Sequence, residues 1–406
     1  MLEELLSDLF YGDYLNAYRL IIMNTRHTAP RVLHVITGLD QGGAERQLCC
    51  LLSTAMHAEH SAVFSLKEPG VMAEKLRQSG VLLFSGGGQR SLSLNWMPAL
   101  KRAVMSWKPD LIIGWMYHGN LAASLTRQLG YRGPVIWNVR HSVHDLRLEK
   151  LSTRMIIRTG AWLSNCPKRI LYNSCIAAEQ HEAIGYRKGG RAVLPNGFDV
   201  DHFRPDSGSR NAVRSDLGVD DDEILLGVVG RSHPMKNHLG WVSAMKKLLA
   251  SGVRVHSIMM GAGVDDPEGP VARAVLDAGL QKHITLLPPT DKPERTYPAM
   301  DILVMPSLWG EGFPNVVGEA MASGVPALVT NVGDSASIVG ETGFVVSNGD
   351  PDMLAGRARE AIALGRPRLR ALGVEARERI VTKYDLSSLA DRYHSLFQEV
   401  LKGINN

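Results

Sequence analysis

Cysteine is scarce in this chain. Four cysteines occur among 406 residues, Cys49, Cys50, Cys166 and Cys175, and none forms a C-x-x-C pair. Small disulfide-stapled domains and cysteine-ligated zinc sites need a higher density or a tighter spacing. The sequence therefore predicts neither a disulfide framework nor a zinc site, and it fits a reducing compartment.

Long apolar runs are missing as well. No stretch approaches the ~18–20 consecutive apolar residues that a membrane-spanning helix needs. The chain begins with acidic residues ahead of its first basic residue, Arg19, whereas a secretory signal starts basic and continues apolar. We expect residues 1–30 to be an amphipathic or poorly ordered leader, and the protein to be cytoplasmic, either free or peripheral on the inner face of the membrane.

A large excess of one charge is also absent. Lysine and arginine total 45 against 41 acidic residues, and the formal net charge is +4. A balance this mild does not indicate a nucleic-acid partner. The length suits two domains of ~150–200 residues each.

Short apolar runs alternate with helical patterns along the chain, and such alternation predicts βαβ units and parallel sheets. A stretch rich in Pro, Gly, Asp and Ser at 194–210 interrupts the alternation, which then restarts. We therefore expect an α/β protein of two Rossmann-like domains that face a central cleft. The expected parts are an N-terminal domain at 31–205, a C-terminal domain at 206–384, and a helix at 385–406 that packs back toward the first domain. Strand-like runs begin near residues 32, 62, 81, 111, 134 and 170 in the first half and at 224, 257, 284, 301 and 326 in the second.

Two glutamates stand at the mouth of a predicted helix in the second half. Glu311 lies in a Gly/Pro loop, and Glu319 lies just over one turn into the helix that starts near Asn315. Backbone N–H groups at such a helix start can bind an anion or a hydroxyl. Two carboxylates there can accept hydrogen bonds from sugar and ribose hydroxyls. Taken alone, the pair fits ordinary solvated acids equally well.

Two cations follow a strand that ends at Gly230. Arg231 and Lys236 lie in a loop ahead of a helix that starts near Asn237. Cations at the carboxyl end of a strand, beside a helix start, can clamp a diphosphate. For an arbitrary Arg and Lys, a solvated loop is the better interpretation.

Candidate residues in the first half also follow strands. Gly42 and Gly43 permit close backbone approach, and Ala44 begins a helix. Glu45 and Arg46 can touch an acceptor or a phosphate, with helix capping as an equal alternative.

Two histidines follow later strand-like runs. His141 and His118 each come directly after such a run and can therefore face the cleft. A satisfied structural histidine is the competing interpretation for both.

Together these segments resemble the retaining glycosyltransferases of family 4, which have the GT-B fold. The E-x7-E signature of that family corresponds to EGFPNVVGE, its Arg and Lys five positions apart to Arg231 and Lys236, and its N-terminal loop to GGAER at 42–46. The resemblance covers roughly residues 31–401. It implies a transferase that moves a hexose-type sugar from a nucleotide diphosphate, a UDP-sugar in preference to a GDP-sugar. The implied acceptor is a saccharide or a polyprenyl-diphosphate-linked glycan, in the assembly of a cell-surface polysaccharide, lipopolysaccharide or glycolipid.

The resemblance also implies roles for individual residues. The catalytic set is His141, Glu311, Arg231 and Lys236. The donor-binding set is Gly42, Gly43, Arg231, Lys236, Phe313, Pro314, Asn315, Val316 and Glu319. The acceptor-side set is Glu45, Arg46 and His118. No cofactor and no metal are expected, because the two cations can neutralise the diphosphate. The base pocket should involve residues 287–290, where a double proline departs from the more usual glycine and leaves the base open.

Two other functions fit the same architecture. One is a catalytically silent GT-B subunit that binds a partner glycosyltransferase or a glycan, which the intact motif residues disfavour. The other is a GT-B nucleotide-sugar epimerase, which the paired glutamates beside the GGAER loop disfavour.

Basic residues gather at 147–169. Arg147, Lys150, Arg154 and Arg158 are spaced 3, 4 and 4 apart, so the sequence predicts that they share one helical face. Lys168 and Arg169 follow. Such a face suits anionic lipid headgroups or a diphosphate-lipid, and a solvated surface is an equal alternative.

Overall fold

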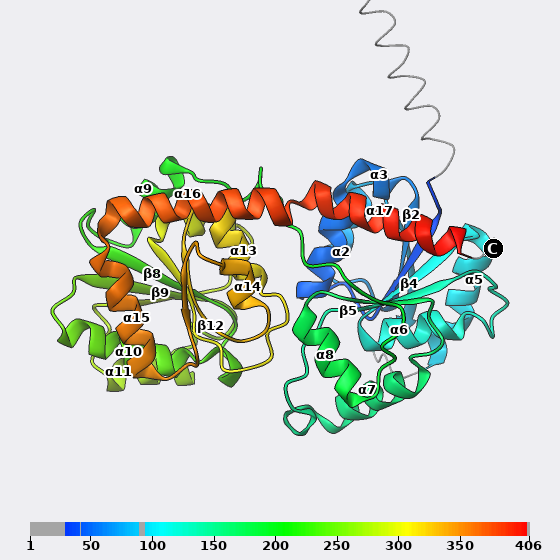
Figure 1. Cartoon of the computed structure of the whole chain (residues 1–406), viewed down its shortest axis with the longest axis horizontal. Coiled ribbons are helices and arrows are strands. Elements are labelled where there is room, and N and C mark those ends of the chain that lie inside the picture. The colour runs from blue at the N-terminus through cyan, green and yellow to red at the C-terminus, as the bar shows by residue number, and fades with distance from the viewer. Residues whose placement is uncertain (1–28, 41, 89–93, 404–406) are drawn as a thin grey trace, which may run out of the picture.

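The computed structural model describes residues 29–40, 42–88 and 94–403. Of the leader expected at residues 1–30, residues 1–28 lie outside the described residues. Two α/β domains stand side by side, each built on its own parallel sheet (Figure 1). This arrangement confirms the expected fold class. None of the helices in the described part of the chain is long and apolar enough to cross a membrane.

The N-terminal sheet has seven parallel strands in the order β3-β2-β1-β4-β5-β6-β7. The direction of the strand order reverses between β1 and β4, and ligands of open α/β sheets bind beyond the carboxyl ends of strands at such a point. The strands are β1 (Val32–Ile36), β2 (Ser61–Lys67), β3 (Leu82–Gly88), β4 (Leu111–Trp115), β5 (Val135–Val139), β6 (Arg169–Tyr172) and β7 (Arg191–Val193). The helices are α2 (Gly43–Ser53), α3 (Ala55–Ala58), α4 (Met72–Gln78), α5 (Met97–Trp107), α6 (Met116–Leu125), α7 (Leu151–Leu163) and α8 (Cys175–Ile184), with 3-10 turns at Leu94–Trp96 and Leu146–Leu148.

The C-terminal sheet has six parallel strands in the order β10-β9-β8-β11-β12-β13. They are β8 (Ile224–Val229), β9 (Val255–Met260), β10 (Ile284–Leu287), β11 (Ile302–Met305), β12 (Ala327–Thr330) and β13 (Phe344–Val346). The helices are α9 (Ser207–Asp216), α10 (His238–Ala250), α11 (Pro270–Asp277), α12 (Pro293–Thr296), α13 (Asn315–Ala322), α14 (Ser335–Val339) and α15 (Pro351–Ala363), with 3-10 turns at Pro234–Lys236 and Tyr297–Ala299.

Two strands were not expected from the sequence. β7 and β13 have three residues each and lie at the outer edge of their sheets. A three-residue edge strand is too short to show an apolar periodicity, and it forms because a neighbouring strand offers an unpaired edge. The other strands lie where apolar runs predicted them.

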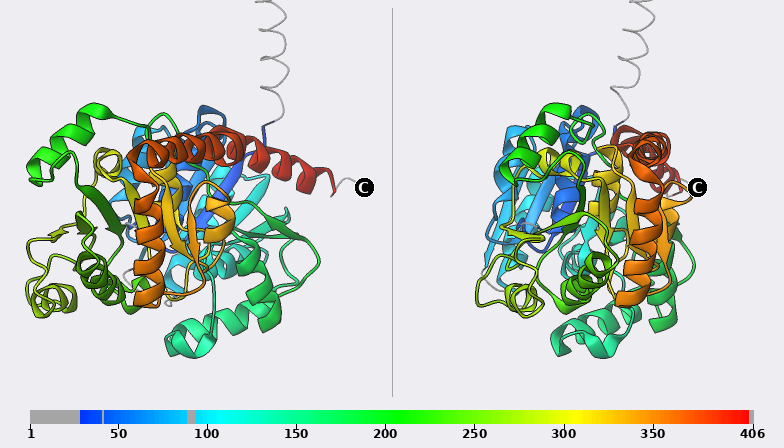
Figure 2. Two further views of the ribbon diagram at one scale, coloured as in Figure 1. Left: turned by 60° about the vertical axis from the view of Figure 1, so that its left-hand side comes forward. Right: turned by 90° about the vertical axis from the view of Figure 1, so that its left-hand side faces the viewer.

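The chain crosses between the domains twice. The first crossing follows β7, and the second joins α16 (Gly365–Tyr384) to α17 (Leu386–Lys402). Figure 1 shows these two helices following one another along one side of the molecule, and the turned views of Figure 2 agree. The crossings are bonded to each other, because Phe198 N donates to Tyr384 O at 2.9 Å and Leu386 N donates to Phe198 O at 3.0 Å.

Helix α17 belongs to the core of the N-terminal domain. Leu389, Tyr393 and Phe397 are buried in one cluster with side chains of β1, α2 and β4. His57 contacts Ala390 O through Nε2 at 2.9 Å. Burial of apolar surface stabilises a fold by about 25 cal/mol per Å², so the buried face of α17 holds this helix on the first domain.

Candidate functional site

A cavity of about 370 Å³ lies between the domains. Its walls are loops at the carboxyl ends of parallel strands in both sheets, where α/β proteins bind ligands. The N-terminal domain contributes Gly42, Gly43, Ala44, Arg46, Arg140, His141, Asn173 and Asn196. The C-terminal domain contributes Val229, Gly230, Arg231, Met235, Lys236 and residues 310–316.

The glycine pair forms the start of α2. Gly42 is its N-cap, and a Cβ atom there would meet Glu45 Oε2 at 2.0 Å. The Glu45 carboxylate therefore folds back onto the first turn of its own helix, and burial raises its pKa. Glu45 does not line the cavity. The helix start instead presents Gly43 and Arg46 to it.

Arg46 and Glu319 meet across the domain boundary. Arg46 Nη1 lies 3.3 Å from Glu319 Oε1, and the buried Tyr297 hydroxyl donates to Glu319 Oε2 at 2.7 Å. The Glu319 carboxylate is thus held at both oxygens, one of them by the opposite domain. Hydrogen-bonded partners of this kind are what a buried carboxylate requires.

Lys236 and Glu311 form a second pair at the cavity wall. Lys236 Nζ lies 2.6 Å from Glu311 Oε1, which also accepts the Ser307 hydroxyl at 2.7 Å. Arg231, on the same loop as Lys236, is exposed and lines the cavity. Two cations and one carboxylate therefore face one space, with a net positive charge among them.

The loop ahead of α13 is fixed by the other domain. Asn196 Nδ2 donates to Phe313 O at 3.1 Å and also contacts Asn315 Oδ1. Gln47 Nε2 lies 3.5 Å from the same Asn315 oxygen. These bonds use a backbone carbonyl and side-chain atoms and none of the N–H groups at the start of α13, where Asn315 and Val316 line the cavity.

Asp334 ties the same loop to helix α8. Its backbone N–H donates to Gly312 O at 2.9 Å, while its carboxylate accepts from Cys175 N at 3.0 Å and Ile176 N at 3.3 Å. A carboxylate is favourable at a helix start, and burial raises its pKa. The positions of the two domains are therefore linked to the loop that carries Glu311.

His141 lies at the end of β5 with partners on two sides. Its Nδ1 is 3.2 Å from the Tyr117 hydroxyl, and its Nε2 is 3.7 Å from Glu149 Oε1. Burial lowers its pKa, Glu149 opposes that shift, and Arg231 adds to it. The imidazole is neutral near pH 7 and can exchange hydrogen bonds with a ligand in the cavity.

The structure brings most of the expected residues together. Eleven expected side chains or loop residues line the cavity: Gly42, Gly43, Arg46, His141, Arg231, Lys236, Glu311, Phe313, Pro314, Asn315 and Val316. Glu319 lies directly behind it, bound to Arg46. Glu45 and His118 are elsewhere. Burial lowers the pKa of His118, and the positive charge of Lys67 lowers it further.

Sequence reasoning missed three polar residues of the cavity. Arg140, Asn173 and Asn196 line it, and each follows a strand of the N-terminal sheet. The positions of Arg140 and Asn173 just after β5 and β6 were a usable signal, because carboxyl ends of parallel strands share one edge. Asn196 follows β7, which no apolar run in the sequence indicates. The region expected to hold the base, 287–290, ends in the exposed Pro288, Pro289 and Thr290 just after β10.

The expectation of one basic helical face at 147–158 is wrong. Helix α7 begins only at Leu151, after a separate 3-10 turn that carries Arg147. Arg147 pairs with Asp145 at 2.8 Å, and Arg154 folds back to donate to Glu149 O at 2.8 Å. The break lies at Glu149 and Lys150, whose extended backbone, with ψ of 150° and 147°, separates the 3-10 turn from α7.

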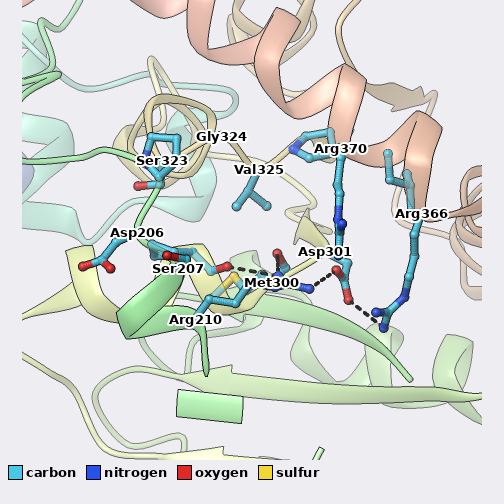
Figure 3. Close-up of a pocket in the computed structure, with 14 residues that line it drawn as sticks. Asp206, Ser207, Arg210, Met300, Asp301, Ser323, Gly324, Val325, Arg366 and Arg370 are labelled. Carbon is cyan, nitrogen blue, oxygen red and sulfur yellow. Dashed lines mark hydrogen bonds and ion pairs between the residues drawn. The ribbon is translucent and has the colours of Figure 1, made fainter. Parts of the chain in front are cut away.

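A second pocket lies away from the cleft, in the C-terminal domain (Figure 3). The Asp301 carboxylate lines it, pairs with Arg210 at 2.6 Å and lies 3.8 Å from Arg366. Both arginines also bind backbone carbonyls, those of Met300 and Glu223 among them. This cluster joins α9, β11 and α16, and its charges serve the fold.

No group of three or more His, Cys, Asp or Glu side chains within 29–40, 42–88 and 94–403 is arranged to hold a metal ion. The four cysteines are free thiols.

Comparison with known proteins matches both halves of the chain. The model of Glycosyltransferase Family 4 matches residues 41–202, and that of Glycosyl transferases group 1 matches residues 223–363. D-inositol 3-phosphate glycosyltransferase of Nocardia farcinica is 33% identical over 220 residues, 51% of this chain and 48% of that protein. The chain thus spans about half the length of this curated relative. The putative glycosyltransferase EpsF of Bacillus subtilis is 23% identical over 320 residues, 74% of this chain and 79% of that protein.

Solved structures share the whole architecture. Anabaena Alr3699/HepE in complex with UDP superposes with a TM-score of 0.78 at 18% identity, over 91% of this chain and 100% of that one. WaaG, a glycosyltransferase involved in lipopolysaccharide biosynthesis, superposes with a TM-score of 0.68 at 15% identity, over 90% of this chain and 98% of that one. With a family model on each half and this common fold, the chain belongs to the glycosyltransferases of the family 4 type, which have the GT-B fold.

Proposed function

We propose that this chain transfers a hexose, with retention of configuration, from a UDP-hexose to a saccharide or a polyprenyl-diphosphate-linked acceptor. The observation that carries the proposal is the cavity between the domains, where Arg231, Lys236 and Glu311 face the start of α13. That combination offers cations for a diphosphate and a carboxylate with backbone N–H groups for a sugar.

The two cations act on the leaving group. When the bond between the sugar and the diphosphate breaks, negative charge develops on the phosphate oxygens, and Arg231 and Lys236 are placed to stabilise it. Lys236 exchanges part of its interaction with Glu311 for the phosphate, since one Nζ carries three N–H donors. The same two side chains supply the charge that a metal ion would otherwise supply, so we propose transfer without a metal.

The two glutamates bind different parts of the donor. Glu311 lies in the cavity and accepts hydrogen bonds from hexose hydroxyls. Glu319, one turn into α13 and held by Arg46 and Tyr297, accepts from the ribose. HepE, which was crystallised with UDP and with UDP-glucose, supports a uridine donor through its common fold.

The acceptor class rests on relatives. A galactosyltransferase of Escherichia coli that is 26% identical over 225 residues, 57% of that protein, is named for an α-D-GlcNAc-diphosphoundecaprenol acceptor. The Nocardia relative is named for D-inositol 3-phosphate. A phosphorylated or lipid-diphosphate-linked acceptor agrees with both names.

Contact with an anionic membrane is part of the proposal, at helix α7. Leu151, Met155 and Trp162 are exposed by 69%, 64% and 80%, and their spacing of 4 and 7 puts them on one face of the helix. Lys150 directly precedes Leu151, Arg158 lies between Met155 and Trp162 on the same face, and both cations are exposed. An exposed apolar stripe bordered by cations fits the interface of a bilayer that contains anionic lipid.

Incubation of the purified chain with a panel of nucleotide hexoses tests the proposal. We expect hydrolysis or transfer with at least one UDP-hexose, unaffected by excess chelator, and loss of turnover in Glu311→Gln with UDP binding retained. Absence of turnover with every donor, in the presence of saccharide and polyprenyl-diphosphate acceptors, would contradict an active transferase. Loss of activity with chelator, restored by Mg²⁺, would contradict only the metal-free chemistry.

A further inference from the structure

Behind His141, a chain of polar groups runs into the interior of the N-terminal domain. The Tyr117 hydroxyl lies 3.2 Å from His141 Nδ1 and 2.9 Å from Nε2 of His181, and Nδ1 of His181 lies 2.7 Å from Ala177 O. Tyr117 comes from the start of α6, and His181 from α8. This series of hydrogen-bonded groups ends at the Ala177 carbonyl, and that carbonyl determines the direction of every hydrogen bond in the series.

The carbonyl sets the tautomer of His181. A carbonyl oxygen can only accept, so His181 must carry its proton on Nδ1. The ring is fully buried, and burial lowers its pKa to about 4, so it is neutral at pH 7. A neutral imidazole protonated at Nδ1 has a lone pair at Nε2, which can only accept.

The orientation of the Tyr117 hydroxyl follows. Its single proton must be donated to His181 Nε2, because that nitrogen cannot donate. The hydroxyl oxygen is then left as the acceptor for its other neighbour, Nδ1 of His141. His141 must donate there, and its own proton therefore also lies on Nδ1.

This order leaves His141 Nε2 with a lone pair, 3.7 Å from the Glu149 carboxylate. We propose that Tyr117 and His181 are positioning residues that hold His141 as the Nδ1–H tautomer, so that His141 Nε2 and Glu149 together form a two-acceptor receptor for a donating hydroxyl of the bound sugar. The proposal rests on the proposed function only for the identity of that ligand. Glu149 would then be a substrate-binding residue of the site.

The charges around His141 agree with this arrangement. Glu149 and Arg231 are the charged groups that face it, one from the N-terminal domain and one across the cavity, and their effects on its pKa oppose each other. Burial lowers the pKa below its ordinary value, so the acceptor form persists at neutral pH. Two acceptors with no proton between them need a donor to bridge them, and a sugar hydroxyl is such a donor.

Nitrogen-15 spectra of selectively labelled histidine in the full chain test the tautomers directly. We expect both His141 and His181 to show a protonated Nδ1 and an unprotonated Nε2 at pH 7.5. A wild-type His141 protonated at Nε2 would overturn the proposal. This measurement requires no turnover, so its outcome stands apart from that of the proposed transferase.

Tyr117→Phe removes the hydroxyl that connects His141 to His181, here called the relay, and leaves both imidazoles in place. We expect His141 to move toward the Nε2–H tautomer, where it donates to Glu149, and turnover to fall on the order of ten-fold, as when other outer partners of a reactive imidazole are removed. Affinity for UDP should be unchanged, whereas the preference for UDP-hexose over UDP should decrease, because only the hexose meets this receptor.

Tyr172→Phe is the matched control. Tyr172 packs against the same His181 ring, with centroids 5.7 Å apart, and its buried hydroxyl has no hydrogen-bond partner among the described residues. We expect wild-type tautomers and turnover in this variant. An equal loss of turnover in the Tyr172 and Tyr117 variants, with the His141 tautomer unchanged in both, would reduce the relay to a packing role and contradict the proposal.

Discussion

At the scale of single residues, the two cations of the cavity are in unequal situations. Lys236 is mostly buried and paired with Glu311 at 2.6 Å, whereas Arg231 is exposed and has no ion-pair partner within the described residues. Removal of one partner of a buried pair leaves the other charge uncompensated, which costs more than the interaction itself. Substitution of Lys236 therefore disturbs both the clamp and the fold, and Arg231 is the cleaner probe of anion binding.

We expect Arg231→Ala to weaken UDP binding by about 1.5–3 kcal/mol, the range for a charge-assisted hydrogen bond, which is roughly a 10- to 150-fold rise in Kd. The melting temperature should change little. Lys246→Ala, on an exposed position of α10, removes the same charge away from the cavity and is the control. Titration calorimetry measures the difference, and equal affinities for UDP in the wild type and the Arg231 variant would exclude the clamp.

The positions of Arg231, Lys236 and Glu311 at the cavity were predictable, because each lies in a loop that follows an apolar strand-like run. Only the resemblance to family 4 gave these residues a role. The partners that hold them were not predictable, since Tyr297, Asn196 and Asp334 reach the site only through tertiary contacts. Spacing along the chain contains no information about which side chain of the opposite domain meets a carboxylate.

At the scale of elements, helix α7 shows what a helical pattern does and does not determine. The pattern of charges predicted one long basic face, yet the extended backbone at Glu149 and Lys150 interrupts the helix, and Arg154 donates to backbone carbonyls. What remains exposed is an apolar stripe with cations beside it. A charge pattern determines a face only if the helix is continuous through it, and here the helix is interrupted before Leu151.

We expect the chain to bind vesicles that contain anionic lipid, and to be released by salt because screening shortens the electrostatic range to about 8 Å at physiological strength. Replacement of Met155 and Trp162 by Ser should abolish binding, whereas Arg158→Glu should weaken it and reduce its salt dependence. Val374→Ser, at an exposed apolar position of α16, is the control. Sedimentation with vesicles measures the bound fraction. Undiminished binding of the Met155 and Trp162 variant would show that α7 is ordinary solvated surface.

At the scale of the whole molecule, the two crossings between domains meet at Phe198. Its backbone pairs with the junction of α16 and α17, and its ring fills the space that a Cβ of Gly318 would need, at 2.0 Å. Gly318 lies in α13, directly before Glu319. The connection between the domains is thus packed against the helix that carries the donor-site glutamate, so domain position and donor site are mechanically coupled.

We expect Phe397→Ala in α17 to destabilise the N-terminal domain by about 3–5 kcal/mol, the range for truncation of a buried phenylalanine. The loss should appear as faster amide hydrogen exchange in β1 and α2, which pack against this helix. Val381→Ala, at a partly exposed position of α16, should have a small effect. Faster exchange confined to the C-terminal sheet would contradict the assignment of α17 to the first domain.

The place of α17 has a consequence for how the protein is made. During translation β1 and α2 are synthesised early. Helix α17, which covers them, is synthesised only after the entire second domain. Until then Leu48, Leu52 and their neighbours lack part of their apolar cover, and such surface is prone to aggregate. The first domain therefore matures last although it is synthesised first. A nascent chain stalled before residue 386 should bind chaperones at α2, and release should coincide with the translation of α17.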